Sequence, residues 1–142
     1  MTETSQQSVS GIVLAGGRGS RMGFADKGLV ELDGVRLIEH VIRRIRDDVS
    51  ELIISCNRNF DEYKQYGIVV EDNRPGFPGP LAGILSAAAQ VTSPICLVVP
   101  CDMPHLPENL CQKLMAQLNA HSACVVHDGY RLQPLVMLLR KS

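Results

Sequence analysis

The chain has 142 residues, of which 45% are hydrophobic and 20% are charged, and its formal net charge is −1. This length and composition fit one globular domain with a substantial core and exclude a disordered protein. The near-neutral charge gives no basic field for nucleic acid, and no apolar run reaches the ~20 residues that a membrane span needs.

The amino-terminal residues and the cysteines bear on domain organisation and location. Residues 1–9 are polar and lack the positive start and apolar middle of a signal peptide, so we expect a disordered tail. The five cysteines are odd in number and show no C-x-x-C spacing, which favours reduced thiols acting as small hydrophobes. We therefore expect a cytoplasmic protein with a single domain over residues 10–142.

Short apolar runs alternate with amphipathic stretches along the chain. In chain order, strands are predicted at Ser10–Ala15, Glu51–Cys56, Gly67–Val70 and Ile95–Val99, with a last pair at Ala123–His127 and Leu135–Leu139 around an Asp128-Gly129 turn. Helices are predicted over Leu37–Ile45, over Leu81–Ala89, and from Pro107-Glu108 to Leu118. Continuous β-branched strands suit a parallel sheet covered on both faces. The prediction is a doubly wound, mostly parallel α/β sheet in three layers, with ligands beyond the carboxyl ends of its strands.

The loop after the first strand is the most informative stretch, and it reads L-A-G-G-R-G-S-R-M-G-F-A-D-K. Its glycines allow backbone N–H groups to approach phosphate oxygens. Arg18, Arg21 and Lys27 carry three positive charges against one negative charge on Asp26, which leaves +2 locally. Arginine and lysine are the usual phosphate-binding side chains, although a glycine-rich surface turn with solvated charges would show the same spacing.

Two other kinds of glycine loop fit the sequence less well. A Walker loop needs Ser or Thr after its lysine, whereas Gly28 follows Lys27. A dinucleotide-binding loop needs an acidic residue at the end of the second strand to hold the ribose, whereas this strand ends Ser55-Cys56-Asn57.

The run L-A-G-G-R-G-S-R-M-G-F-A-D-K-G-L resembles the signature of molybdenum cofactor guanylyltransferases, the MobA family of nucleoside-triphosphate transferases. Further motifs continue the resemblance at successive strand ends: N-R-N from Asn57, E-D from Glu71, G-P-L-A-G-I from Gly79 and P-C-D-M-P from Pro100. The resemblance implies a Rossmann-like nucleotide-diphospho-sugar transferase fold. It also implies that the chain is shortened at its carboxyl end, because family members typically continue for some fifty residues more.

The resemblance implies transfer of GMP from GTP to the molybdenum–molybdopterin cofactor, with pyrophosphate as the second product. Asp102 would bind Mg²⁺, which prefers one or two carboxylates together with substrate phosphates, although a turn or helix-capping role is the plain alternative. Arg21 and Lys27 would hold the phosphates and stabilise charge on the departing pyrophosphate. The implied partners are GTP and the molybdopterin cofactor, with transient contacts to cofactor-biosynthesis proteins or molybdoenzymes, and neither nucleic acid nor membrane.

The same resemblance implies a nucleotide-binding set of nine residues: Leu14, Ala15, Gly16, Gly17, Lys27, Asn57, Asp72, Gly79 and Asp102. Asn57 and Asp72 have side chains that read hydrogen-bond edges, but either could equally be a turn residue. Two alternatives stay open at this point. One is a nucleotidyltransferase that uses CTP or a sugar phosphate, and the other is a GTP-binding remnant without turnover.

Overall fold

The structure is a computed structural model, and it describes residues 8–15, 26–71, 80–118, 121–127 and 132–141. Within these residues, six strands form one sheet in the order β5-β4-β1-β6-β8-β7. The strands are β1 (Val9–Leu14), β4 (Glu51–Cys56), β5 (Ile68–Glu71), β6 (Ile95–Pro100), β7 (Ala123–His127) and β8 (Leu132–Arg140). Strands β5, β4, β1 and β6 are parallel, whereas β8 runs antiparallel to both β6 and β7.

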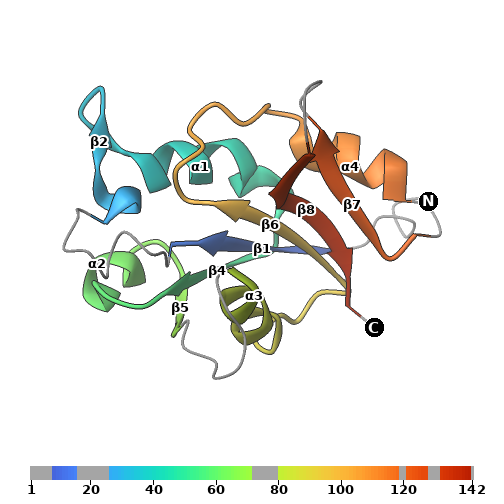
Figure 1. Ribbon diagram of the computed structural model, residues 1–142, viewed down its shortest axis with the longest axis horizontal. Helices are drawn as coiled ribbons and strands as arrows, with labels where there is room; N and C mark the ends of the chain where they lie inside the picture. Colours follow the sequence, from blue (N-terminus) through green and yellow to red (C-terminus); the bar gives the residue numbers. More distant parts are fainter. Residues whose placement is uncertain (1–7, 16–25, 72–79, 119–120, 128–131, 142) are drawn as a thin grey trace.

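Helices cover the two faces of the sheet, as Figure 1 shows, with α1 (Leu37–Ile45) and α4 (Leu110–Leu118) on one side and α3 (Pro80–Ala88) on the other. Helix α1 has an apolar stripe because Ile38, Val41, Ile42 and Ile45 recur at helical spacing, and all four are buried. Helix α3 packs on β1, β4 and β5. The predicted three-layer, mostly parallel α/β fold is therefore confirmed.

The central strands explain why the sheet is so well buried. All six residues of β1 and all six of β6 are buried, as expected for parallel strands sandwiched between helices. The larger core cluster lies on the α1 and α4 side and the smaller one on the α3 side, where Ile12, Val98 and Ala87 meet.

The Glu51 carboxylate links neighbouring segments at the end of the sheet where the parallel strands begin. Glu51 begins β4 and accepts hydrogen bonds from the Ser10 hydroxyl on β1 and from the backbone and hydroxyl of Thr92 at 2.8 and 2.9 Å. The Ser10 bond first, and those from Thr92 after it, lower the pKa of Glu51 below its ordinary value. This edge lies at the opposite end of β1 from the predicted site.

Five smaller elements of the described residues were not predicted from the sequence, the last of them η4, a 3₁₀ turn over Arg46–Asp48 that follows α1. Strands β2 (Glu31–Leu32) and β3 (Val35–Arg36) form a separate two-stranded hairpin, which projects beside α1 in Figure 1. Its turn, Asp33-Gly34, has φ of 56° and 79°, the left-handed geometry of a tight hairpin. The third element, α2, is the short helix Phe60–Lys64, and the fourth, η3, is a 3₁₀ turn over Lys27–Leu29.

The boundaries of the predicted elements need small corrections. Helix α4 begins at Leu110 rather than at Pro107, although the Leu110 amide donates to the Pro107 carbonyl in a preceding turn. Strand β8 begins at Leu132, three residues before the predicted start, and pairs with β7 through an irregular register near Val125. The predicted Asp128-Gly129 turn lies outside the described residues.

Candidate functional site

The carboxyl ends of β1, β4 and β6 meet at one edge of the sheet. The Ala15 amide, just after β1, donates to the Ser55 carbonyl on β4 at 2.7 Å. The Cys101 amide, just after β6, donates to the Leu14 carbonyl at 3.0 Å. Leu14 and Ala15, two predicted nucleotide contacts, are buried at this edge. The Leu14 carbonyl and the Ala15 amide are already hydrogen-bonded to neighbouring chain segments.

Lys27 and Asp102 come together at this edge, although 75 positions separate them in the sequence (102 − 27). The Lys27 ammonium lies 3.8 Å from an Asp102 carboxylate oxygen, and their side chains are 71% and 37% exposed. Lys27 belongs to η3, which contacts α1, and Asp102 lies in the turn two residues after the end of β6. The structure therefore brings together a cation and a carboxylate that solvent and a ligand can both reach.

The remaining predicted site residues are less fully placed. Asn57 is exposed in the bend that follows β4, two residues after Ser55 at the same edge. The other predicted residues lie outside the described part of the chain: Gly16, Gly17, Arg21, Asp72 and Gly79. Gly83, in α3, is packed tightly on β4, because a Cβ there would lie 2.6 Å from the Ser55 hydroxyl oxygen.

A buried carboxylate beside Lys27 was not singled out from the sequence. The Asp26 side chain is only 7% exposed, and the Tyr63 hydroxyl donates a 2.5 Å hydrogen bond to it. The Asn59 amide donates to the other carboxylate oxygen at 3.1 Å, and Arg58 Nε lies 3.9 Å from that oxygen. The sequence signal that could have revealed this cluster is an acidic residue inside an otherwise basic glycine loop.

Burial sets the acid–base character of the groups around Asp26. Desolvation first, and the hydrogen bond to Asp26 second, raise the pKa of Tyr63 well above its usual value, so its hydroxyl stays protonated and donates. Desolvation, followed by the charges of Asp102 and Asp26, raises the pKa of the Cys101 thiol to about 12. Cys101 is therefore a poor nucleophile at neutral pH.

The donor set at the edge constrains how a metal ion would bind. In the described part of the chain, no three His, Cys, Asp or Glu side chains are grouped so as to hold a metal ion. Mg²⁺ commonly uses one or two carboxylates and takes its remaining ligands from substrate phosphates and water. A single partly exposed carboxylate such as Asp102 fits a metal that arrives with a nucleotide, and it does not fit a metal bound by protein alone.

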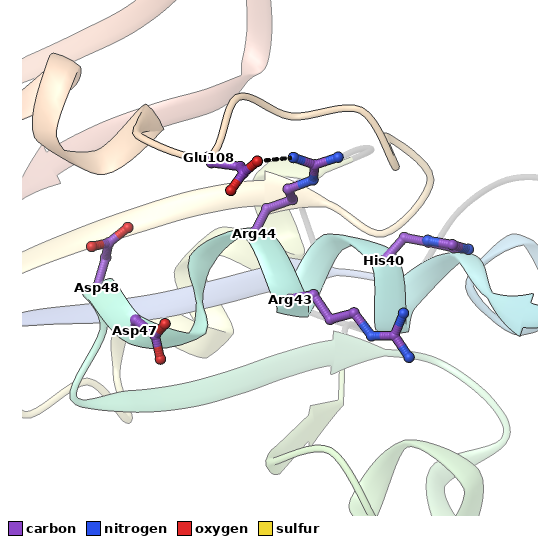
Figure 2. A pocket seen from close by; sticks show the side chains of 6 residues that line it. All are labelled: His40, Arg43, Arg44, Asp47, Asp48 and Glu108. Carbon is purple, nitrogen blue, oxygen red and sulfur yellow. Dashed lines mark ion pairs between the residues drawn. The ribbon is translucent and has the colours of Figure 1, made fainter.

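A surface depression on the outer side of α1 lies apart from this edge. It is lined by His40, Arg43, Arg44, Asp47, Asp48 and Glu108, none of which is a predicted site residue. Figure 2 shows Arg44 and Glu108 facing each other across it, at 3.2 Å. Its acidic and basic side chains are mixed, so the depression does not present the uniform positive charge that a polyphosphate requires.

None of the helices in the described residues is long and apolar enough to cross a lipid bilayer.

The fold is shared with solved structures of nucleotide-handling proteins. Molybdopterin-guanine dinucleotide biosynthesis protein A from Archaeoglobus fulgidus superposes with a TM-score of 0.68 at 26% identity, covering 92% of this chain and 67% of its own. A nucleotidyl transferase from Methanothermobacter thermautotroptrophicus gives a TM-score of 0.71 at 20% identity over 95% of this chain and 72% of its own. The likeness to these structures shows the fold, and the sequence matches that follow show the class, a nucleotidyltransferase.

Sequence comparison then assigns the family. The model of the MobA-like NTP transferase domain matches residues 11–142. A molybdenum cofactor guanylyltransferase from Shewanella sp. strain MR-4 is 47% identical over 137 residues, which cover 94% of this chain and 70% of that relative. A second, from Shewanella halifaxensis, is 45% identical and is covered to 68%. The chain belongs to the MobA-like NTP transferase family.

Proposed function

We propose that this protein transfers GMP from GTP to the molybdenum–molybdopterin cofactor, releasing pyrophosphate and forming the guanine dinucleotide cofactor. The names of the relatives at 45–47% identity support this substrate pair. The observation that carries the proposal is the meeting of Lys27 and Asp102, 3.8 Å apart, at the carboxyl edge of the parallel strands. In open α/β sheets this edge is where ligands bind.

The proposed chemistry is a displacement at phosphorus. An oxygen of the terminal phosphate of molybdopterin forms a bond to the α-phosphorus of GTP, and the bond from that phosphorus to the oxygen bridging the β-phosphate breaks. Pyrophosphate leaves with the electron pair of the broken bond. Such a reaction depends on positioning and charge stabilisation rather than on a covalent enzyme intermediate.

Lys27 and Asp102 each have a defined part in this proposed reaction. The Lys27 ammonium binds phosphate oxygens and stabilises the negative charge that grows on the leaving pyrophosphate. Asp102 would hold Mg²⁺, which when bound neutralises phosphate charge. The 3.8 Å pairing of the two side chains keeps each charge partly compensated before the nucleotide arrives. The partly exposed pair is only weakly held, so separating the two groups costs little.

Substitution of the pair tests the proposal. We expect Asp102→Asn to reduce Mg²⁺-dependent GMP transfer at least about 100-fold, because the amide keeps the shape of the side chain and loses its charge. Lys27→Met should lower transfer by a similar factor. The assay follows radiolabelled GMP appearing on molybdopterin, with Glu108→Gln, which removes the ion pair to Arg44 of α1, as a control. Transfer at wild-type rates in Asp102→Asn would overturn the assignment of the site.

Nucleotide choice tests the substrate part of the proposal. Calorimetric titration should show tighter binding of GTP than of CTP or ATP, and the difference should require Mg²⁺. Equal binding of CTP would favour a cytidylyl transferase. Tight GTP binding without product, even when molybdopterin is supplied, would indicate a protein that binds the nucleotide and does not turn it over.

A further inference from the structure

The carboxylate that precedes Lys27 is held on both of its oxygens. One Asp26 oxygen accepts the Tyr63 hydroxyl hydrogen, and the other accepts from the Asn59 side-chain amide and faces Arg58. Arg58 and Asn59 lie in the segment that joins β4 to α2, and Tyr63 lies within α2. Asp26 therefore links the start of η3 to the segment after β4 and to α2.

The network is buried enough for its hydrogen bonds to matter. Tyr63 is fully buried and the Asp26 side chain is almost so, which places the carboxylate where water cannot solvate it well. A buried carboxylate is tolerated when donors satisfy its oxygens, and removing a donor leaves a costly unpaired charge. Asn59 adopts the left-handed conformation, with φ of 57°, as it begins the turn into α2.

The backbone after Lys27 is fixed by close packing. A Cβ at Gly28 would lie 2.6 Å from the Tyr63 hydroxyl oxygen and 3.2 Å from the Cys101 sulfur. The chain at residue 28 thus lies directly against the Tyr63 ring and the end of β6. Lys27 is flanked on one side by the held Asp26 and on the other by this packed glycine, while its own side chain is 71% exposed.

We propose that Tyr63 and Asp26 are positioning residues, which fix the backbone of Lys27 so that its ammonium faces Asp102. The inference rests on the proposed function for its catalytic consequence and on the geometry alone for its structural part. A long exposed lysine has several rotamers, and only a fixed Cα limits where its charge can reach. Displacements of about 1 Å at a positioned group cost up to ~100-fold in rate.

Kinetics of hydroxyl deletions test the catalytic consequence. Tyr63→Phe keeps the buried ring and removes the hydrogen bond to Asp26. We expect kcat for GMP transfer to fall about tenfold while the KM for GTP stays within about twofold. The matched control is Tyr66→Phe, which removes a hydroxyl that accepts from Arg36 at 3.4 Å, and it should leave both constants unchanged. An unchanged kcat in Tyr63→Phe would overturn the inference.

A double-mutant cycle separates positioning from general loosening of the fold. If Tyr63 acts through Lys27, Tyr63→Phe should change the residual rate of Lys27→Ala less than about twofold. A further tenfold loss in that background would show that Tyr63 acts by another route and would overturn the inference. Should Tyr63→Phe fail to fold, Asp26→Asn replaces it in the same cycle, because the amide keeps an acceptor for Tyr63 and loses the charge facing Arg58.

A readout without catalysis distinguishes this inference from the proposed function. Lysines carrying ¹³C-methyl groups give one NMR signal each, and Asp102→Asn should move the Lys27 signal because its neighbouring charge is lost. In Tyr63→Phe, the same Asp102 substitution should move that signal less than half as far. Equal movement in both backgrounds overturns the inference. Reduced movement in Tyr63→Phe together with no GMP transfer by the wild type supports the positioning and refutes the proposed function.

Discussion

Gly28→Ala probes the packing of the Lys27 turn against Tyr63. The added methyl carbon would lie 2.6 Å from the Tyr63 hydroxyl oxygen, whereas ordinary contact begins at 3.4 Å, so about 0.8 Å of movement is required (3.4 − 2.6). The hydroxyl cannot retreat freely, because Tyr63 is fully buried and bonded to Asp26. Overpacking of this kind costs about 1–3 kcal/mol.

Part of that cost is offset in the unfolded chain. Replacing glycine by alanine reduces the conformational entropy of the unfolded state and stabilises the protein by about 0.4–1 kcal/mol. The net expectation is a loss of about 1–2 kcal/mol in the free energy of unfolding. For a domain of this size, that loss lowers Tm by roughly 3–6 °C, which a thermal melt followed by circular dichroism resolves.

Removing the obstructing atom should remove most of the cost of Gly28→Ala. In Tyr63→Phe the hydroxyl is gone, and the added methyl then meets the ring carbon Cε1 of residue 63 and the Cys101 sulfur, both at 3.2 Å. Gly28→Ala should then cost less than ~0.5 kcal/mol, giving a coupling energy of about 1–2 kcal/mol.

Gly34→Ala is the matched control for this cycle. It adds a methyl group where nothing lies within 4 Å, but at φ of 79°, so its cost of about 1 kcal/mol comes from backbone strain. That cost should be the same with Tyr63 or with phenylalanine at position 63. Equal costs of Gly28→Ala in the two backgrounds would refute the packing argument.

Two further outcomes follow from the burial of ionisable groups. The pKa of Glu51 is lowered in the folded state, so its stabilising effect is present above pH 4.5, the ordinary value, and is lost as pH falls through the folded pKa. Urea unfolding at pH 7, 5 and 3 should therefore show that the free energy of unfolding falls more steeply below pH 4.5 in the wild type than in Glu51→Gln. The same pH dependence in both proteins would contradict this. The Cys101 thiol, with a pKa of about 12, has roughly one part in 10⁴ as thiolate at pH 8, so iodoacetamide should alkylate the half-buried Cys124 first. Peptide mass spectrometry over time gives the order, and early labelling of Cys101 would contradict its burial.

The long elements could be predicted because their patterns are local. Strand β4 and strand β7 have their predicted bounds, and α1 follows from apolar residues at helical spacing. The β2–β3 hairpin is too short to show alternation, although Asp33-Gly34 is a hairpin turn signal that the prediction did not use. Helix α2 has five residues, which is below the length at which periodicity is visible.

Residues of the candidate site could be predicted only where they lie in a recognisable sequence motif. Lys27 and Asp102 were singled out because they lie in runs that resemble a family signature, and the rule for parallel sheets explains why they meet. The bond between Asp26 and Tyr63 joins positions 37 apart, and no periodicity relates them. Such contacts depend on how α2 returns against the strand ends, which is a property of tertiary packing.

The central position of β1 has a consequence for how the chain is made. Val9 pairs with Ile95 of β6, so 86 residues must be added after Val9 before this partner exists (95 − 9). At 5–20 residues per second, this interval is on the order of 4–17 s. Throughout this interval, the apolar, β-branched β1 lacks its β6 neighbour, and that side of the strand is open to pairing with other nascent chains. Chaperone contact during synthesis is therefore expected to concentrate on residues 9–14 and to end once β6 has been translated.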